Sequence, residues 1–216
     1  MSMQCSRTAK RFASRLAIIH TTMREGRPVA RKYTPRGETR GRVLDSALAL
    51  FAEHGFSGTS LQMIADHVGV SKATVYQQFR TKEEMLLALM EPAMERLAEG
   101  VEAAEAEGDR RVQVSDMFDG IIDLVLEFRL RVGLLRADPG TQAIVDRHPE
   151  MSSLVARLRS VLLGPDPSLE DRVTMAVMGA GIMAVGADST LFDMAEDDIR
   201  REMRAVVDRA IGAREP

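Results

Sequence analysis

The sequence predicts an all-α protein, with an N-terminal three-helix domain containing a helix-turn-helix followed by a C-terminal helical bundle. Three observations indicate this class. Apolar residues recur with a period of about 3.6 from Thr39 onward. The 14 Met residues far outnumber the two Tyr, and Trp is absent, which favours aliphatic helix packing over a β-sandwich. Four helix starts and stops fall within about 45 residues, and no segment alternates as a strand does.

Composition narrows the class of protein. The 216 residues, 45% hydrophobic and 28% charged, suffice for one or two globular domains with a buried core, which excludes a disordered chain. Apolar runs are too short to span a bilayer, so we expect a soluble, cytoplasmic protein with no membrane partner. The single cysteine, Cys5, excludes an internal disulfide, and the four scattered histidines form no zinc-binding spacing with it. We expect neither metal nor cofactor.

The net charge of −3 hides a strong asymmetry along the chain. Residues 1–82 hold 14 Lys and Arg against 5 Asp and Glu, a net charge of +9, whereas residues 83–216 hold 15 against 27, a net charge of −12. Within the basic part, residues 1–42 carry 11 basic and 2 acidic side chains. A basic end on an acidic body suggests that the N-terminal part meets a polyanion. A solvated, disordered tail is the alternative interpretation.

Residues 1–38 are predicted to be a disordered basic arm, because they are rich in Arg, contain Gly and Pro, and lack a sustained apolar period. Residues 11–19 can form a short amphipathic turn, and the acid-poor composition is similar to that of an organellar transit peptide. Translation from Met23 would instead leave residues 1–22 untranslated. We expect the helix-turn-helix domain at residues 39–86 and the ligand-binding and dimerisation domain at residues 87–216.

Four helices are predicted in the N-terminal half. The first begins at Thr39, presents Val43, Leu44, Ala47, Leu48 and Phe51 on one face, and ends at Gly55, where a positive φ is tolerated. A short helix begins at Thr59 or Ser60 and ends at Gly69. Ser71 caps a helix that runs to Phe79, and Thr81 caps a long helix that starts at Lys82.

The remaining chain is helical by period and composition. The long helix is predicted over residues 82–106, with a kink at Pro92, and the following segment, 112–135, is apolar on nearly every side, as expected of a central helix. After the turn at residues 138–140, further helices are predicted at 141–147, from Pro149, at 168–187 and at 195–211, with a loop at 164–167.

The segment from Leu61 to Phe79 has the spacing of a helix-turn-helix. Two steeply crossing helices need a small residue at their contact, and Ala65 provides it. Four positions later the chain must turn with a positive φ, where Gly69 stands. Six residues further on, Val75 fills the space between the helices. An αα-hairpin that touches no DNA is the alternative.

Residues 39–89 closely resemble the DNA-binding domain of the TetR family of bacterial transcriptional regulators. The matching features are Ala47 and Phe51 in the first helix, Gly55-Phe56, Gly58-Thr59-Ser60, Ile64-Ala65, Gly69-Val70-Ser71, Thr74-Val75-Tyr76, Phe79 and Thr81-Lys82-Glu83-Glu84-Met85-Leu86. The resemblance covers roughly a quarter of the chain by motif. It implies that the helix from Ser71 to Phe79 lies in the major groove of DNA and that the Tyr76 hydroxyl contacts a phosphate.

The side chains of this helix are candidate base readers. Lys72 can donate to guanine O6 and N7 or to a phosphate, and Gln77 can pair bidentately with adenine. The methyl groups of Ala73 and Thr74 suit the methyl group of thymine. The predicted DNA-binding residues are Arg36, Arg40, Arg42, Thr59, Ser60, Gln62, Ser71, Lys72, Ala73, Thr74, Tyr76, Gln77 and Lys82.

The remaining members of that set are expected at the DNA backbone or in the adjacent minor groove. Lys82 at a helix start is expected to contact a phosphate, and Thr59 and Ser60 likewise at the preceding helix, while Gln62 can reach a base. The motif at residues 43–82 is electrostatically neutral, so attraction must come from the arm. Arg36, Arg40 and Arg42 are therefore expected to enter the adjacent minor groove, as the N-terminal extensions of family members imply.

The acidic body is expected to dimerise and to bind a ligand. The predicted dimer contacts are Val177, Ala180, Ala184, Ile199, Met203, Val206 and Ala210, on the last two helices, which also form the dimer in the resembling family. Packing of these residues within one chain is the alternative. The predicted ligand-lining residues are Met90, Met94, Met117, Phe118, Phe128, Met151, Met175 and Met178, for each of which ordinary core packing is the competing interpretation. Asp119, Asp123 and Glu127 form either a solvated stripe or an inward polar contact.

Together these features predict a ligand-responsive transcriptional regulator that binds a palindromic operator in double-stranded DNA as a homodimer. By resemblance, repression and release by a small-molecule effector are the expected outcome, with the ligand moving the helix after Lys82. A non-sensing architectural DNA-binding protein is the alternative. Catalysis is not expected, because only His148 lies outside the arm and the DNA-binding domain, with no partner nucleophile.

Overall fold

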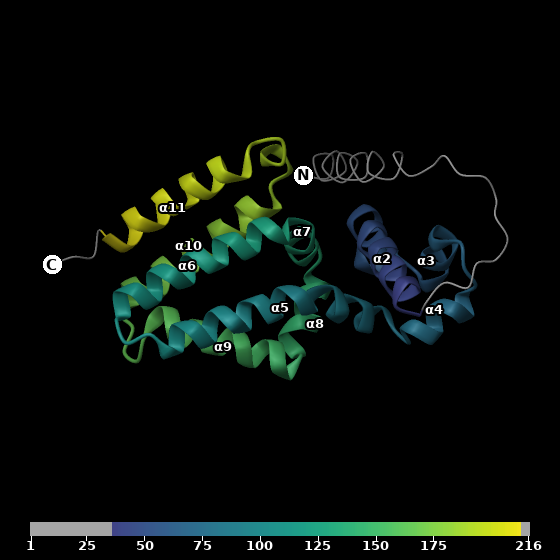
Figure 1. Cartoon of the computed structure of the whole chain (residues 1–216), viewed down its shortest axis with the longest axis horizontal. Coiled ribbons are helices and arrows are strands. Elements are labelled where there is room, and N and C mark those ends of the chain that lie inside the picture. The colour runs from purple at the N-terminus through teal and green to yellow at the C-terminus, as the bar shows by residue number, and fades with distance from the viewer. Residues whose placement is uncertain (1–35, 213–216) are drawn as a thin grey trace. The chain divides into compact units, whose positions relative to one another are not determined.

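The computed structural model describes residues 36–212, except for the side chains of residues 36, 37 and 135–137, and every element in this range is a helix (Figure 1). The all-α prediction is therefore confirmed. Contacts divide the chain into two units: the first contains the described residues up to Leu89 together with Ala137–Thr141, and the second contains Met90–Arg136 and the residues from Gln142 on. The predictions made for residues 1–35, including the start at Met23, lie outside the described residues.

The first unit is built from short helices. These are α2 (Arg36–Gly58), α3 (Leu61–Val68), α4 (Lys72–Gln78) and the first turns of α5 (Lys82–Ala106). Helix α2 starts at Arg36 rather than at Thr39, so the last residues of the predicted arm are helical. Its helical conformation is broken at Gly55, with φ 76° and ψ 160°, which confirms the predicted stop. α5 runs on through Pro92 to its end.

The ends of α3 and α4 follow the capping residues seen in the sequence. The side chains of Ser60 and Ser71 accept hydrogen bonds from the backbone N–H groups of Met63 and Thr74, respectively, which satisfies two donors that a helix N-terminus leaves free. Gly69 ends α3 in the left-handed region with φ 79°. Its N–H group donates to the carbonyl of Ala65, and the turn between the two helices is thereby closed.

Helix α6 lies at the centre of the second unit (Figure 1). The elements that follow α5 are α6 (Arg110–Glu127), α7 (Arg129–Ala137), α8 (Pro139–Arg147), α9 (Pro149–Leu163), α10 (Leu169–Ala187), the 3₁₀ turn η1 (Ser189–Leu191) and α11 (Glu196–Gly212). Helix α6 packs against α9, α10 and α11. One core cluster joins α6, α7, α10 and α11, and another joins α5, α6 and α9. No helix among the described residues is both long and apolar enough to cross a bilayer.

The prediction of a single helix over residues 112–135 is wrong, because the chain breaks at Phe128. This residue caps the C-terminus of α6 with φ −107° and ψ 29°, and α7 begins at Arg129. Phe128 is only 7% exposed. Neither Gly nor Pro stands at the break, so tertiary packing of the Phe128 ring, which local sequence does not reveal, decides its position. Downstream, α8 begins at Pro139, ahead of its predicted start at residue 141.

Arginines of α11 pair with carboxylates of α6. The Arg200 Nε atom lies 2.6 Å from Asp123 Oδ1, and this hydrogen bond raises the pKa of Arg200 above its ordinary value. Arg204 forms an ion pair with Asp119. Asp119 and Asp123 are half exposed and bind arginines of their own chain, so they are part of a surface ladder rather than inward-facing ligand contacts.

Close packing of α10 on α6 depends on Gly186. A Cβ atom at this position would overlap with the Val125 side chain of α6, and both residues are buried. We expect Gly186→Ala to lower the free energy of unfolding of the second unit by about 1–3 kcal/mol, because the two helices must move apart. Thermal denaturation measures this loss. The control variant is Gly120→Ala on α6, an exposed position where the added methyl group would make only an ordinary contact, 3.9 Å from the Met117 side chain, so it should not lower the stability.

Candidate nucleic-acid interface

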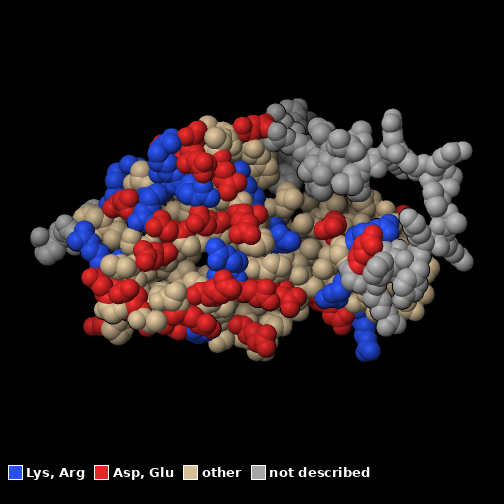
Figure 2. Space-filling view, in the orientation of Figure 1, with Lys and Arg blue, Asp and Glu red and all other residues tan. Residues whose placement is uncertain are grey.

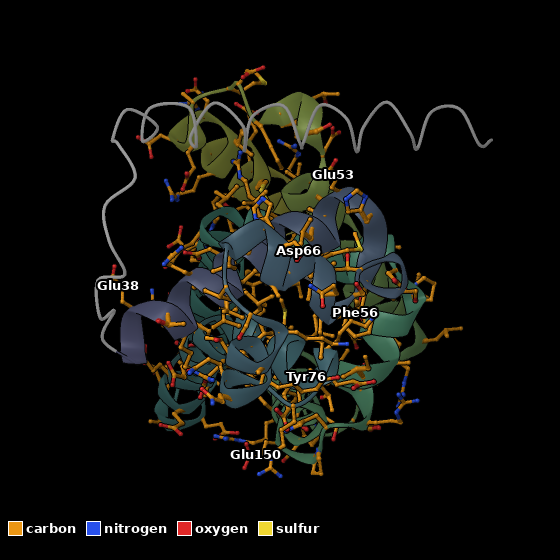
Figure 3. All side chains as sticks on the ribbon, turned by 90° about the vertical axis from the view of Figure 1, so that its right-hand side faces the viewer. Glu38, Glu53, Phe56, Asp66, Tyr76 and Glu150 are labelled. Carbon is orange, nitrogen blue, oxygen red and sulfur yellow. The ribbon has the colours of Figure 1, made fainter. Side chains whose placement is uncertain are left out.

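Helix α4 has one buried apolar side and one exposed, mainly polar side. Val75 is fully buried against the small Ala65, also fully buried, so the two helices approach as the spacing predicted. On the opposite side Lys72, Ala73, Tyr76 and Gln77 are exposed, with Tyr76 47% exposed. Figure 3 looks at the first unit and shows α4 toward the viewer with Tyr76 labelled. Four of the predicted base or phosphate contacts of this helix therefore share one accessible face.

The N-terminal turn of α4 is ordered by its own hydroxyl groups. Ser71 Oγ accepts from the Thr74 N–H group at 3.1 Å and lies 2.8 Å from Thr74 Oγ1. Thr74 is consequently half-buried, with its hydroxyl engaged by Ser71. The Lys72 Nζ atom lies 5.7 Å from the ring centroid of Tyr76. The ammonium group and the phenol of these two residues thus occupy neighbouring positions one turn apart.

Lys82, predicted to contact a phosphate, is held inside the first unit. Its Nζ atom donates to the carbonyl oxygens of Phe56 and Thr59, both at 2.7 Å, and lies 4.7 Å from the centroid of the Phe56 ring. Two of the three donors of the ammonium group are therefore engaged. This lysine ties the start of α5 to the turn that joins α2 and α3.

Thr59 also differs from its expected role. The side chain is 2% exposed, and its hydroxyl lies 3.0 Å from the Leu50 carbonyl and 2.9 Å from the Gly55 carbonyl. A hydroxyl group enclosed in this way is not accessible to a DNA phosphate. It instead satisfies carbonyl groups freed where α2 breaks at Gly55. Ser60 is exposed beside it and caps α3.

Arg40 and Arg42 lie on helix α2 rather than on an extended arm. The Arg42 Nη2 atom donates to the Val68 carbonyl at 2.9 Å, at the C-terminus of α3. Arg40 Nη1 donates to the Gln78 carbonyl at 3.4 Å, and its guanidinium group lies 4.2 Å from the Phe79 ring centroid. Each arginine thus joins α2 to the last turn of another helix of the motif, where cations are favourable. The side chain of Arg36 lies outside the described residues.

Two further exposed residues complete the surface. Gln62 is exposed, and its Nε2 atom donates to Asp66 Oδ1 at 2.7 Å, so a base contact would require this hydrogen bond to break. Arg80 was assigned no role from the sequence, but it is exposed directly after the Phe79 cap of α4. Its backbone N–H group donates to Glu84 Oε2 at 2.6 Å. Arg80 is thus an exposed basic residue beside the exposed face of α4.

The second unit has an acidic surface. Figure 2 shows rows of Asp and Glu side chains over it. On α5 these include the exposed residues Glu91, Glu95, Glu99, Glu102 and Glu105. Glu105 binds Arg157, whose Nε and Nη2 atoms donate to its two oxygens at 3.0 and 2.6 Å, and this hydrogen bonding lowers the pKa of Glu105. A surface of this charge repels nucleic acid.

The predicted ligand-lining residues are buried or half-buried in the second unit, but they divide between two core clusters. Phe118 and Met178 belong to the cluster formed by α6, α7, α10 and α11, and Met175 packs on it. Met117 belongs to the cluster of α5, α6 and α9, and Met94 packs on that one. The other three, Met90, Phe128 and Met151, are also buried.

The predicted dimer contacts separate into two groups. Val177, Ala180 and Ala184 on α10 are exposed, as is Val206 on α11. Ile199 and Met203 are buried in the core formed with α6, and Ala210 packs on that core. The second group is therefore occupied within one chain, as the alternative interpretation held for these positions.

His148 occupies the N-cap position of α9 without a side-chain capping hydrogen bond. The histidine adopts extended backbone angles, and its Nδ1 atom is buried without a hydrogen-bond partner among the described residues. No cluster of three or more His, Cys, Asp and Glu side chains suited to a metal ion occurs within residues 36–212.

Comparisons with known proteins identify the first unit. Residues 43–89 match the family model of bacterial regulatory proteins, tetR family. The chain is 33% identical over 92 residues to the transcriptional activator FasR of Mycolicibacterium smegmatis, covering 42% of each chain. It is 36% identical over 62 residues to the transcriptional repressor AcnR of Corynebacterium diphtheriae, covering 29% of this chain and 33% of that protein. The chain thus spans less than half the length of these curated relatives.

Solved structures resemble the whole described chain in fold. The ketosteroid transcriptional regulator KstR2 of Mycobacterium tuberculosis superposes with a TM-score of 0.62 at 18% identity, covering 86% of this chain and 98% of that one. The TetR-family regulator PfmR of Thermus thermophilus gives a TM-score of 0.53 at 24% identity, covering 81% and 100%. At these identities the likeness concerns the fold alone.

Proposed function

This chain belongs, through residues 43–89, to the tetR family of bacterial regulatory proteins, and we propose that it is a ligand-responsive transcriptional regulator, acting as a repressor. In this proposal a homodimer binds a palindromic operator and leaves it when a small molecule binds the second unit. The observation that carries the proposal is the exposed polar face of α4, which lies opposite the fully buried Val75 on the same helix. The mechanism assigns no catalytic step to the chain.

DNA recognition is assigned to α4 in the major groove. A groove about 12 Å wide admits one helix, and the exposed Lys72 and Gln77 carry the donors and acceptors that distinguish guanine and adenine there. Tyr76 and Arg80 supply phosphate contacts on either side. Arg40, Arg42 and Lys82 hold the helices of the motif together, so that α4 enters the groove as part of a rigid unit.

We expect Gln77→Ala to relax selection at one base position, costing about 1–3 kcal/mol of binding free energy at the preferred base and little elsewhere, because a bidentate contact is lost. Binding titrations against operators altered at single positions measure this pattern. Gln142→Ala serves as the control, because Gln142 is exposed on α8 and its amide bonds Asp146 of the same helix. A uniform loss at every position would contradict the base-reading role.

A dimer is required because one short helix contacts too few base pairs to select a genomic site. The exposed face of α10 supports this pairing: Leu169 is 77% exposed, Val173 54% and Val177 65%. Gly179 and Gly181 on the same helix have open space beside them, which allows the backbone of a second helix to approach closely. We assign the face to a second copy, since a twofold interface places recognition helices about 34–36 Å apart on DNA.

Two helices connect the DNA-binding unit to the acidic unit and can carry a ligand signal. Helix α5 passes from one unit to the other between Leu89 and Met90, and α8 does so between Thr141 and Gln142. A ligand that binds better to one arrangement of these helices than to another shifts the protein toward that arrangement. Operator affinity would then fall because the separation of the two recognition helices changes.

Selection of bound sequences from random DNA tests the proposal. A regulator should recover an inverted repeat with half-sites about one helical turn apart, bound with a Kd on the order of 10⁻⁸–10⁻¹¹ M at physiological salt. The alternative, a non-sensing architectural DNA-binding protein, should recover no defined sequence and should lose affinity steeply with salt. If no repeat were recovered, the regulator proposal would be wrong and the architectural DNA-binding protein would be the better interpretation.

A further inference from the structure

An arginine with two buried nitrogen atoms stands at the break between α6 and α7. Arg129 is the first residue of α7, and its Nε and Nη2 atoms are inaccessible to solvent. Neither atom has a hydrogen-bond partner among the described residues. The guanidinium carbon lies 5.5 Å from the ring centroid of Phe192, in the segment between α10 and α11. The side chain therefore joins two segments of the second unit that are distant in sequence.

Such a side chain is energetically unfavourable unless something accepts its hydrogen bonds. A guanidinium group has five N–H donors and no acceptor. A buried donor without an acceptor costs about 1–3 kcal/mol, and more when it is charged. The contact with the Phe192 ring contributes about 0.5–2 kcal/mol, which does not offset two such donors. These two donors of Arg129 thus lack, within residues 36–212, the acceptors that would make their burial favourable.

The two donors without acceptors, Nε and Nη2, form the edge of the guanidinium group that can bind both oxygens of one carboxylate. Nε–H and one N–H of Nη2 point in the same direction on one edge of the guanidinium plane, matching the two oxygens of a carboxylate. The same chain shows this geometry at Arg157, whose Nε and Nη2 atoms bind Oε1 and Oε2 of Glu105. Arg129 presents the same edge inside the second unit.

Apolar residues stand close in sequence to both Arg129 and Phe192. Val132 follows one turn later on α7 and belongs to the core cluster shared with α10 and α11. Leu191, next to Phe192, packs on that cluster. No acidic residue occupies the first turn of α7. A carboxylate held by Arg129 would therefore lie near aliphatic side chains of this cluster.

We infer that Arg129 is the anchor of a binding site for an organic carboxylate with an apolar body, which is the effector of this regulator. The carboxylate accepts from Nε and Nη2, and the body packs against the aliphatic side chains around α7. Phe192 lies outside both α10 and α11, so its ring can be displaced without breaking either helix. The effector role rests on the proposed function, whereas the binding site does not.

Thermal-shift titrations of the full-length protein with octanoate and benzoate test the site, with octanamide and benzamide as uncharged counterparts of the same shape. At least one acid should raise the melting temperature and its amide should not. In Arg129→Met the apparent Kd for that acid should rise about 10- to 100-fold, because charge-assisted hydrogen bonds are lost. Arg129→Lys keeps the charge but loses the bidentate edge, and should give an intermediate Kd.

The melting temperatures of the variants without ligand distinguish a ligand site at Arg129 from an ion pair that stabilises the fold. Arg129→Met should keep or raise the melting temperature without ligand, because a buried charge without an acceptor is removed. Arg157→Met is the matched control: it breaks an arginine–carboxylate pair on α9 and should leave the response to octanoate and benzoate unchanged.

Three results would overturn the inference: no shift with either acid, equal shifts in wild type and Arg129→Met, or a fall in melting temperature of unliganded Arg129→Met, which would assign Arg129 to an acceptor of its own chain. If inorganic phosphate raised the melting temperature as much as the acids do, the ligand would be a phosphate and the carboxylate assignment would be wrong. The DNA selection described above uses no ligand, so failure of the regulator function and failure of this site are told apart.

Discussion

We expect Val177→Glu to convert a dimer into monomers and to reduce operator affinity by about 10²–10⁴-fold, the range gained when two binding modules act together. Val177 is 65% exposed near the middle of α10, between Val173 and the small residues Ala180 and Ala184. In a twofold interface each residue meets the equivalent surface of the partner, so one substitution buries two carboxylates in an apolar contact. Sedimentation equilibrium and operator titration measure the two effects.

The control for this variant is Val112→Glu. Val112 is a Val on α6 with 40% exposure, so the same substitution places a carboxylate on another surface of the second unit. It should leave both the sedimentation mass and the operator affinity unchanged. If Val177→Glu stayed dimeric, α10 would not be the interface, and the exposed Val206 on α11 would be the next surface to change.

Local signals predicted most of the secondary structure. Ser60 and Ser71 cap helices as their side chains suggested, and Pro149 begins α9. Gly69 adopts the positive φ that a helix-turn-helix needs. These features succeed because a cap or a turn involves residues within about four positions of each other, and the sequence displays them together.

The roles of the basic residues could not be predicted in this way. Arg42 donates to a carbonyl group 26 residues away, and Lys82 donates to two, 26 and 23 residues away. Arg40 donates to the carbonyl of Gln78 at the end of α4. A free carbonyl at a helix end has no sequence signature, whereas a lysine or arginine in a DNA-binding motif suggests a phosphate. The folded geometry decides which partner each cation has.

The two C-terminal helices illustrate a similar limit. Helix α10 is apolar around most of its circumference, so its sequence does not say which side packs on α6. The buried stripe of α11 contains Ile199, Met203 and Val207, which face α6 within the chain. Sequence periodicity predicted that both helices pack against another helix through an apolar face. Only the packed core shows which residues pack within the chain and which are exposed.

We expect Lys82→Met to destabilise the first unit and Lys72→Met to leave its stability unchanged. The Lys82 variant leaves the carbonyl groups of Phe56 and Thr59 without their donor, which costs about 2–6 kcal/mol at about 1–3 kcal/mol for each lost partner. Met keeps most of the aliphatic packing, so the loss reports on the ammonium group. Hydrogen exchange in peptides from residues 56–82 measures the stability of this unit separately from the acidic unit.

The salt dependence of DNA binding gives the opposite ranking of the two lysines. Lys72 is exposed on α4, and its replacement should reduce the slope of log K against log salt by about one. Lys82 is engaged at two carbonyl groups, so its replacement should leave that slope unchanged when binding is measured under conditions where the unit stays folded. A Lys82→Met protein with full exchange protection and a shallower slope would instead make Lys82 the phosphate contact predicted from the sequence, and the internal hydrogen bonds would then contribute little to stability.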